Sequence, residues 1–237
     1  MRILRILVLV AVCLPVAAHA GDVLFTNDGG TFTSNTGGTT GTIGQTTLSL
    51  SGSYLVGISG LSGLGVADQS VSFPGCEPGC LGMVTLTTGT LTTGVLNETG
   101  TFSSSVPIGT FGTGCPTGVT GPCGTFTVDG PGGMVFTGQL SSASWFKPSA
   151  GTFTLQGTVT NATLTINGVM YSISSAVTID LTTNGTGEIN NGNGTVSFSN
   201  DDGSTNFLSP VPEPGTLALL GTGLIAVGIF AKRVAAS

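Results

Sequence analysis

The chain has 237 residues, of which only 7% are charged and 40 are glycines. Between Gly21 and Ser209 it carries ten acidic residues and one base, Lys147, which gives this stretch a net charge of −9. Binding of nucleic acid depends on clustered lysines and arginines that release counterions, so this charge excludes nucleic acid as a partner. Helix formers are scarce while Thr, Val, Gly and Asn are abundant, which predicts an all-β protein.

The first twenty residues have the pattern of a secretory signal peptide. Basic residues precede an apolar stretch at residues 6–16, and Ala18 and Ala20 form a small-x-small cleavage site before Gly21. We therefore expect residues 1–20 to be removed during export, so that the mature chain begins at Gly21.

Alternating apolar and polar residues predict many short strands in an exported Ser/Thr/Gly-rich β domain, residues 21–209. The expected strands cover residues 47–58, 84–92, 124–128, 134–140, 152–159, 177–181 and 196–198. Many short strands separated by turn residues are typical of an antiparallel β-sandwich or a jelly-roll-like fold, which we expect here.

The clearest local signal is the Asn167-Gly168 pair, which stands between two alternating segments. Asn-Gly favours a two-residue hairpin turn because both turn positions need positive φ. In that hairpin Ile166 faces Val169 and Leu164 faces Tyr171, and we expect this side of the ribbon to be buried.

The mature chain has four cysteines, and export brings them into an oxidising compartment, so we expect disulfides. Cys76 and Cys80 flank a Glu-Pro-Gly turn, while Cys115 and Cys123 flank a segment rich in Gly and Pro. These turn residues favour pairing within each loop, 76 with 80 and 115 with 123. Pairing between the two loops stays open. Zinc is disfavoured, because the mature chain has no histidine to share its ligation.

The predicted mature chain lacks the groups that most catalytic sites need. Its only histidine, His19, leaves with the signal peptide, and residues 21–209 contain no arginine. Ser-His-Asp catalysis, His-ligated metals and Arg-clamped phosphoryl transfer are therefore excluded. Carboxylates remain, yet no pair stands out as the acid and base of a glycan hydrolase. We expect a protein that is not an enzyme.

Two features indicate ligands. Asn27-Asp28-Gly29-Gly30 and Asn200-Asp201-Asp202-Gly203 supply hard oxygens in turns, which suits calcium, although neither has EF-hand spacing and such residues commonly serve only as turn formers. We expect no cofactor, with calcium as the alternative. Trp145 is the candidate for stacking on a sugar ring.

The C-terminus divides into three short segments. Residues 210–215 form a Pro-rich spacer, residues 216–231 contain no charge, and residues 232–237 begin with the basic pair Lys232 and Arg233. Sixteen helical residues span roughly 24 Å, which is marginal for a bilayer unless the flanking basic side chains snorkel. We expect a single short transmembrane helix with its basic end in the cytoplasm.

This tail, VPEPGTLALLGTGLIAVGIFAKR, resembles the PEP-CTERM sorting tail. The resemblance rests on Pro212, Glu213 and Pro214, the apolar span and the basic pair in that order. It implies recognition by an exosortase, a membrane-embedded processing protease of bacteria that make exopolysaccharide, with cleavage near Pro212–Pro214 and transient anchoring in the membrane.

Together these features predict a non-catalytic extracellular or cell-surface protein that is processed by an exosortase system and associated with an exopolysaccharide or biofilm matrix. A carbohydrate-binding module centred on Trp145 is the first alternative. A secreted glycan hydrolase is the second.

Overall fold

A computed structural model describes residues 22–72, 79–97, 102–119, 123–191 and 194–208. These residues belong to one compact unit, Gly21–Ser209. The predicted signal peptide, Pro-rich spacer and C-terminal helix lie outside the described residues. Within those ranges, no helix is long and apolar enough to cross a membrane.

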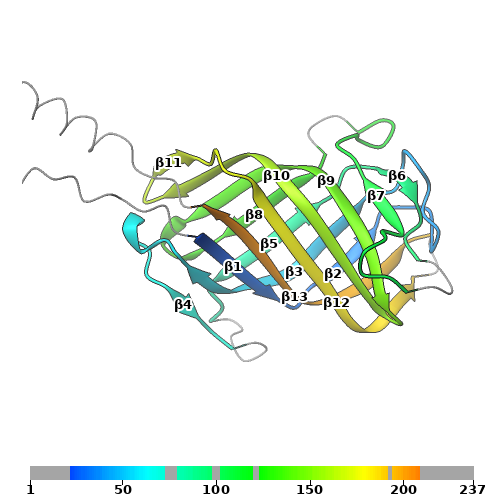
Figure 1. Ribbon diagram of the computed structural model, residues 1–237, viewed down its shortest axis with the longest axis horizontal. Helices are drawn as coiled ribbons and strands as arrows, with labels where there is room; N and C mark the ends of the chain where they lie inside the picture. The colour runs from blue at the N-terminus through cyan, green and yellow to red at the C-terminus, as the bar shows by residue number, and fades with distance from the viewer. Residues whose placement is uncertain (1–21, 73–78, 98–101, 120–122, 192–193, 209–237) are drawn as a thin grey trace, which may run out of the picture. The chain divides into compact units, whose positions relative to one another are not determined.

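The described residues form thirteen strands and two short 3₁₀ turns, shown in Figure 1. In chain order the elements are β1 (Asp22–Asp28), β2 (Thr31–Ser34), β3 (Leu48–Ser59), η1 (Ser62–Leu64), β4 (Gln69–Ser70), β5 (Gly82–Thr87), β6 (Leu91–Gly94), β7 (Gly109–Phe111), β8 (Thr125–Asp129), η2 (Pro131–Gly133), β9 (Val135–Ser149), β10 (Thr152–Ile166), β11 (Val169–Ser172), β12 (Val177–Asn190) and β13 (Val196–Leu208).

Eight of these strands close into an antiparallel barrel in the order β10, β12, β13, β1, β3, β5, β8 and β9, with β9 pairing back to β10 (Figure 1). The predicted all-β, antiparallel class is confirmed. Within that class, the strands form one sheet closed on itself instead of the two packed sheets of a sandwich. The physical reason is the pairing of β9 and β10, which are fifteen residues each and hydrogen-bond to barrel neighbours on both sides. Closure leaves these long strands without free edges.

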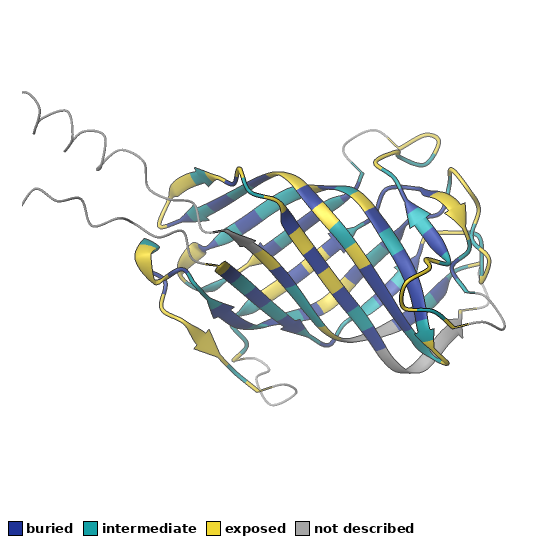
Figure 2. Ribbon diagram, in the orientation of Figure 1, coloured by how far each residue is buried: buried dark blue, intermediate teal, exposed yellow. Residues whose placement is uncertain are grey.

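The barrel interior is filled by apolar side chains. Along β10 and β12 buried and exposed residues alternate, as Figure 2 shows, because successive side chains of a strand point to opposite faces. The largest of these fully buried side chains are aromatic, among them Phe25, Phe32, Phe126, Phe136, Trp145, Phe153 and Phe198. The inside of this barrel is therefore a packed core, and ligand sites have to be sought on its outer face or at its ends.

The predicted Asn-Gly hairpin forms the turn between β10 and β11. Asn167 and Gly168 have φ of 51° and 78°, and the register pairs Ile166 with Val169 and Leu164 with Tyr171, as expected. The expected burial of this side holds for Ile166 and Leu164 but not for Val169, which is 52% exposed. Within the described part of the chain β11 pairs with β10 alone, so its outer residues lack a neighbour that would cover them.

Candidate binding surface and sorting tail

Trp145 lies in the barrel core and not on the surface. It is 0% exposed, its ring stacks on Phe153 with centroids 5.4 Å apart, and its indole N–H donates to the carbonyl of Leu96 at 2.7 Å. The prediction that Trp145 stacks on a sugar is wrong, because no part of its ring reaches the surface. Trp145 follows the inward alternation of β9, which the sequence pattern around it did not reveal.

The two Asn/Asp/Gly segments predicted as calcium ligands come together in the fold. β1 and β13 pair so that Asp28 stands opposite Asp202 and Asn27 opposite Gly203. The Asn27 amide is buried and donates to the Ser53 hydroxyl at 2.7 Å, and Asp28 accepts the Gly29 N–H at 2.7 Å. Among the described residues no group of three or more acidic, His or Cys side chains is placed to hold a metal. The expectation of no cofactor, with calcium as the alternative, therefore stays a prediction.

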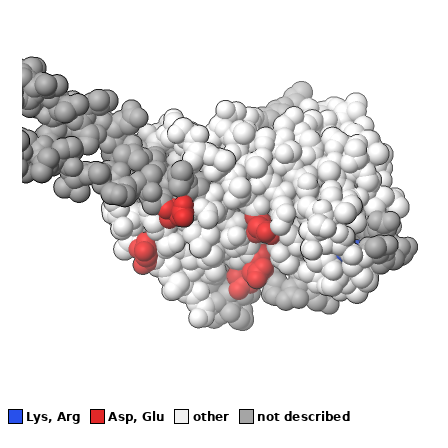
Figure 3. Space-filling view, in the orientation of Figure 1, with Lys and Arg blue, Asp and Glu red and all other residues white. Residues whose placement is uncertain are grey.

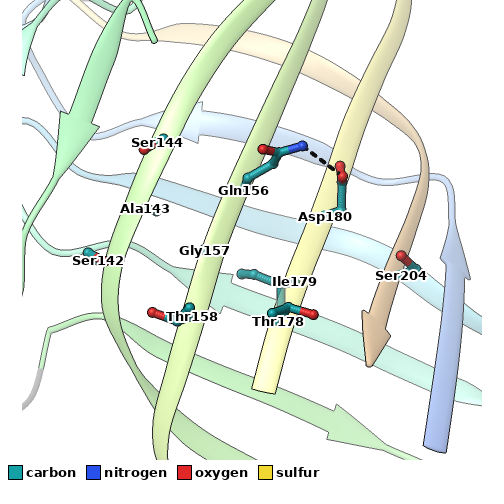
Figure 4. Close-up of a pocket in the computed structure, with 10 residues that line it drawn as sticks. All are labelled: Ser142, Ala143, Ser144, Gln156, Gly157, Thr158, Thr178, Ile179, Asp180 and Ser204. Atoms are coloured by element: carbon teal, nitrogen blue, oxygen red, sulfur yellow. Dashed lines mark hydrogen bonds between the residues drawn. The ribbon is translucent and has the colours of Figure 1, made fainter. Parts of the chain in front are cut away.

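The outer face of the barrel carries a shallow polar depression of about 390 Å³. Its lining comes from β9, β10, β12 and β13 and consists of Ser142, Ala143, Ser144, Gln156, Gly157, Thr158, Thr178, Ile179, Asp180 and Ser204 (Figure 4). Gly157 pairs with Ala143 and Ile179, whose side chains turn inward, so these three residues form the floor. Polar side chains on either side of this floor form the rim.

Four rim side chains make one row across four strands. The register places Ser144 beside Gln156, Gln156 beside Asp180, and Asp180 beside Ser204. The Gln156 amide donates to the Asp180 carboxylate at 2.9 Å, which orients both groups (Figure 4). Neighbouring strands lie about 4.8 Å apart, so the row presents hydroxyl, amide, carboxylate and hydroxyl groups at nearly regular intervals. Such a row can hydrogen-bond to a polyhydroxylated ligand.

This site was not predicted from the sequence. Its four side chains come from strands whose pairing is decided by the closed sheet, so no local motif joins them. The available signal was weak: Gln156 and Asp180 are polar residues at outward positions of the predicted strands 152–159 and 177–181.

Charge on the described surface is almost entirely negative. Figure 3 shows acidic side chains on the face that carries β12, β13 and β1, where Asp180, Asp202 and Asp28 lie on adjacent strands. Lys147 is only 7% exposed and therefore offsets little of this surface charge. A neutral ligand suits this face better than an anionic one.

The structure joins Cys115 to Cys123 by a disulfide, as predicted. Cys80 is also disulfide-bonded, and its expected partner Cys76 lies outside the described residues. Thr117 in the 115–123 loop is hydrogen-bonded by Gln45 at 2.8 Å, which ties the loop to the segment before β3. The described cysteines, Cys80, Cys115 and Cys123, are therefore structural links.

The C-terminal residues 210–233 match the family described as the PEP-CTERM protein-sorting motif. The chain carries a PEP-CTERM sorting motif. The matched range includes Pro212, Glu213 and Pro214 as well as Lys232 and Arg233, which confirms the resemblance of the tail. No curated protein and no solved structure shows significant similarity to the chain.

A PEP-CTERM motif implies an exported, cell-surface protein that an exosortase system processes. The motif residues and the predicted signal cleavage site at Ala18, Ala20 and Gly21 lie outside the described residues. The sorting motif therefore determines where the chain is sent, and it says nothing about what the barrel does.

Proposed function

We propose that this PEP-CTERM protein is a non-catalytic surface protein whose barrel binds a neutral exopolysaccharide of its own cell. The observation that carries the proposal is the row Ser144, Gln156, Asp180 and Ser204 on an exported, tail-sorted domain. Alternating donors and acceptors match the hydroxyl groups of a glycan chain.

The depression is shallow and its lining contains no aromatic ring, so a single site supplies little apolar contact. We therefore expect weak binding to one sugar unit and stronger retention by a polymer, because a polymer engages many copies of the protein at once. This behaviour suits a component of an extracellular matrix.

A secreted glycan hydrolase is the second candidate, favoured by one observation. Asp28 and Asp202 are two carboxylates placed opposite each other on neighbouring strands. Glycosidases use two carboxylates that flank the bond to be cleaved. The pair lies outside the lining of the depression, so the hydrolase proposal requires a different part of the surface from the binding proposal.

The test uses exported protein purified from a host with an exosortase and exopolysaccharide purified from the same host. Saturable binding is measured for the wild type, for Q156A and D180A, and for D129A as the control. Asp129 is an exposed strand carboxylate outside the depression. We expect D180A to weaken binding by about tenfold, since a hydrogen bond to a charged group contributes about 1.5 kcal/mol. Q156A should weaken it by about two- to tenfold, since a hydrogen bond between neutral groups contributes about 0.5–1.5 kcal/mol.

Two results oppose the proposal. If Q156A, D180A and the wild type bind with equal affinity, the depression is not part of the binding site. Release of new reducing ends from the polysaccharide by the wild type, abolished in D28N and D202N, would favour the hydrolase instead.

A further inference from the structure

Lys147, the sole base between Gly21 and Ser209, is buried at the end of β9. Its Nζ atom donates to the side-chain oxygen of Asn97 at 2.6 Å. Fifty residues of chain separate the two, so the tertiary structure alone brings them together. A buried amine in contact with a side-chain amide is an arrangement in which the two groups can react.

Two aromatic rings lie close to the Lys147 amine. Nζ lies 5.4 Å from the centroid of the Phe102 ring and 5.5 Å from that of Phe153, and the Phe153 ring stacks on Trp145. The Phe153 ring is buried and shields one side of the nitrogen from water, whereas the Phe102 ring is 47% exposed.

The backbone holds Asn97 in place from several directions. The Asn97 N–H donates to the Thr39 carbonyl at 3.0 Å, and the carbonyl of the preceding Leu96 accepts the Trp145 indole N–H at 2.7 Å. On the other side of the segment, the Ser103 N–H donates to the Lys147 carbonyl at 2.9 Å. These hydrogen bonds hold the backbone on both sides of the contact between Lys147 and Asn97. Folding therefore meets much of the entropic cost of bringing the two side chains together.

We propose that Lys147 and Asn97 join in an intramolecular isopeptide bond. The Lys147 nitrogen attacks Cγ of Asn97, a new C–N bond forms, and the bond from Cγ to Nδ2 breaks. The Lys147 ammonium gives up one proton before its nitrogen attacks and a second as the new bond forms. Both protons pass to Nδ2, so that the side-chain amide nitrogen leaves as ammonium and a neutral secondary amide remains. Atoms and charge balance without an oxidant, a reductant or a further reactant.

The bond would close a covalent loop from residue 97 to residue 147 that contains β7, β8 and most of β9. The Cys115–Cys123 disulfide lies inside this loop. Unlike that disulfide, an amide link persists under reducing conditions, so it would stabilise the barrel independently of the redox state outside the cell.

The test is the intact mass of exported, reduced protein. We expect the wild type to be lighter by one ammonia than the mass calculated for its processed chain, while K147R and N97A have the full masses calculated for theirs. Proteolysis of the wild type should yield one branched peptide that joins residues 97 and 147. K147R should also unfold at a lower temperature than the wild type under reducing conditions.

Asn-Gly sequences also lose ammonia when they form succinimides, and the chain has four of them, at Asn167, Asn184, Asn191 and Asn193. That loss does not depend on Lys147. A wild-type mass equal to that calculated for the processed chain, or an ammonia loss of the same extent in K147R, would overturn the proposal. Because the wild-type mass alone decides the first outcome, a variant that fails to fold does not obscure the result.

Discussion

The ring of Trp145 lies nearly parallel to that of Phe153, with an angle of 10° between their planes, and both rings contact Phe198 edge-on. This three-ring cluster connects three strands of the barrel. β9 and β10 are the strands whose pairing closes the barrel, and β13 is the last strand of the chain. Because Trp145 lies in this buried cluster, we expect it to stabilise the fold and not to contact a ligand.

The first prediction concerns that role. Trp145→Ala should lower the free energy of unfolding by about 3–5 kcal/mol, because it removes a fully buried ring and leaves a cavity. Trp145→Phe should cost less, since it keeps one ring in the stack. Urea denaturation of the exported proteins measures both. If Trp145→Ala leaves the stability unchanged but abolishes polysaccharide binding, Trp145 belongs to the ligand site instead.

The second prediction concerns the β10–β11 turn. Gly168 has φ of +78°, and an added Cβ would meet no atom within 4 Å, so any cost of a side chain there comes from the backbone. Gly168→Ala should lower stability by about 1 kcal/mol. Gly63→Ala is the matched control, because Gly63 also has open space around it but no positive φ, and it should be close to neutral. If Gly168→Ala and Gly63→Ala change the stability equally, the positive φ of Gly168 is not the cause of the loss.

The third prediction concerns the Cys115–Cys123 disulfide. Replacing both cysteines by serine should lower stability by about 2–3 kcal/mol, because an eight-residue separation closes a short loop in the unfolded chain. Thiol titration of denatured, unreduced mature protein should find no free thiol. Four free thiols would contradict both the disulfide and the expected oxidising compartment.

The fourth prediction concerns the two facing carboxylates, Asp28 and Asp202. Like charges directly opposite each other destabilise a strand pair, so Asp28→Asn should raise stability by about 0.2–1 kcal/mol at low ionic strength, with a smaller gain in salt. The asparagine oxygen can still accept the Gly29 N–H. Asp22→Asn, opposite Leu208, is the control and should show no such gain.

The same variant tests calcium. If calcium bridges Asp28 and Asp202, the wild type should melt at a higher temperature with calcium than with a chelator, and Asp28→Asn should lose that difference. Equal melting temperatures of the wild type in calcium and in chelator would count against a bound ion.

The fifth prediction concerns the PEP-CTERM tail. Replacing Pro212, Glu213 and Pro214 by alanine should leave export intact but make the protein accumulate uncut in the membrane, because the extended segment that the protease reads is lost. Mass spectrometry of the C-terminus in a host with an exosortase measures this. Wild-type protein that retains Lys232 and Arg233 in such a host would show that the segment only anchors the chain.

The sequence by itself was sufficient for features that depend on neighbouring residues. The sorting motif at residues 210–233 is a contiguous pattern, and the Asn167-Gly168 turn needs only the local preference for positive φ. The turn residues between Cys115 and Cys123 favoured their pairing but left pairing between the two loops open. The all-β class follows from composition, because Thr, Val and Gly act through local propensity wherever they stand.

Tertiary structure decided what depends on residues far apart in the chain. Alternation along β9 and β10 is the same in a sandwich and in a barrel, so only their mutual pairing closes the sheet. The closed sheet places Trp145 in the core, the register of β10 with β12 aligns Gln156 with Asp180 on the outer face, and the tertiary fold brings Lys147 to Asn97. A strand pattern shows which residues share a face, whereas strand order and register decide which face is buried and which side chains meet.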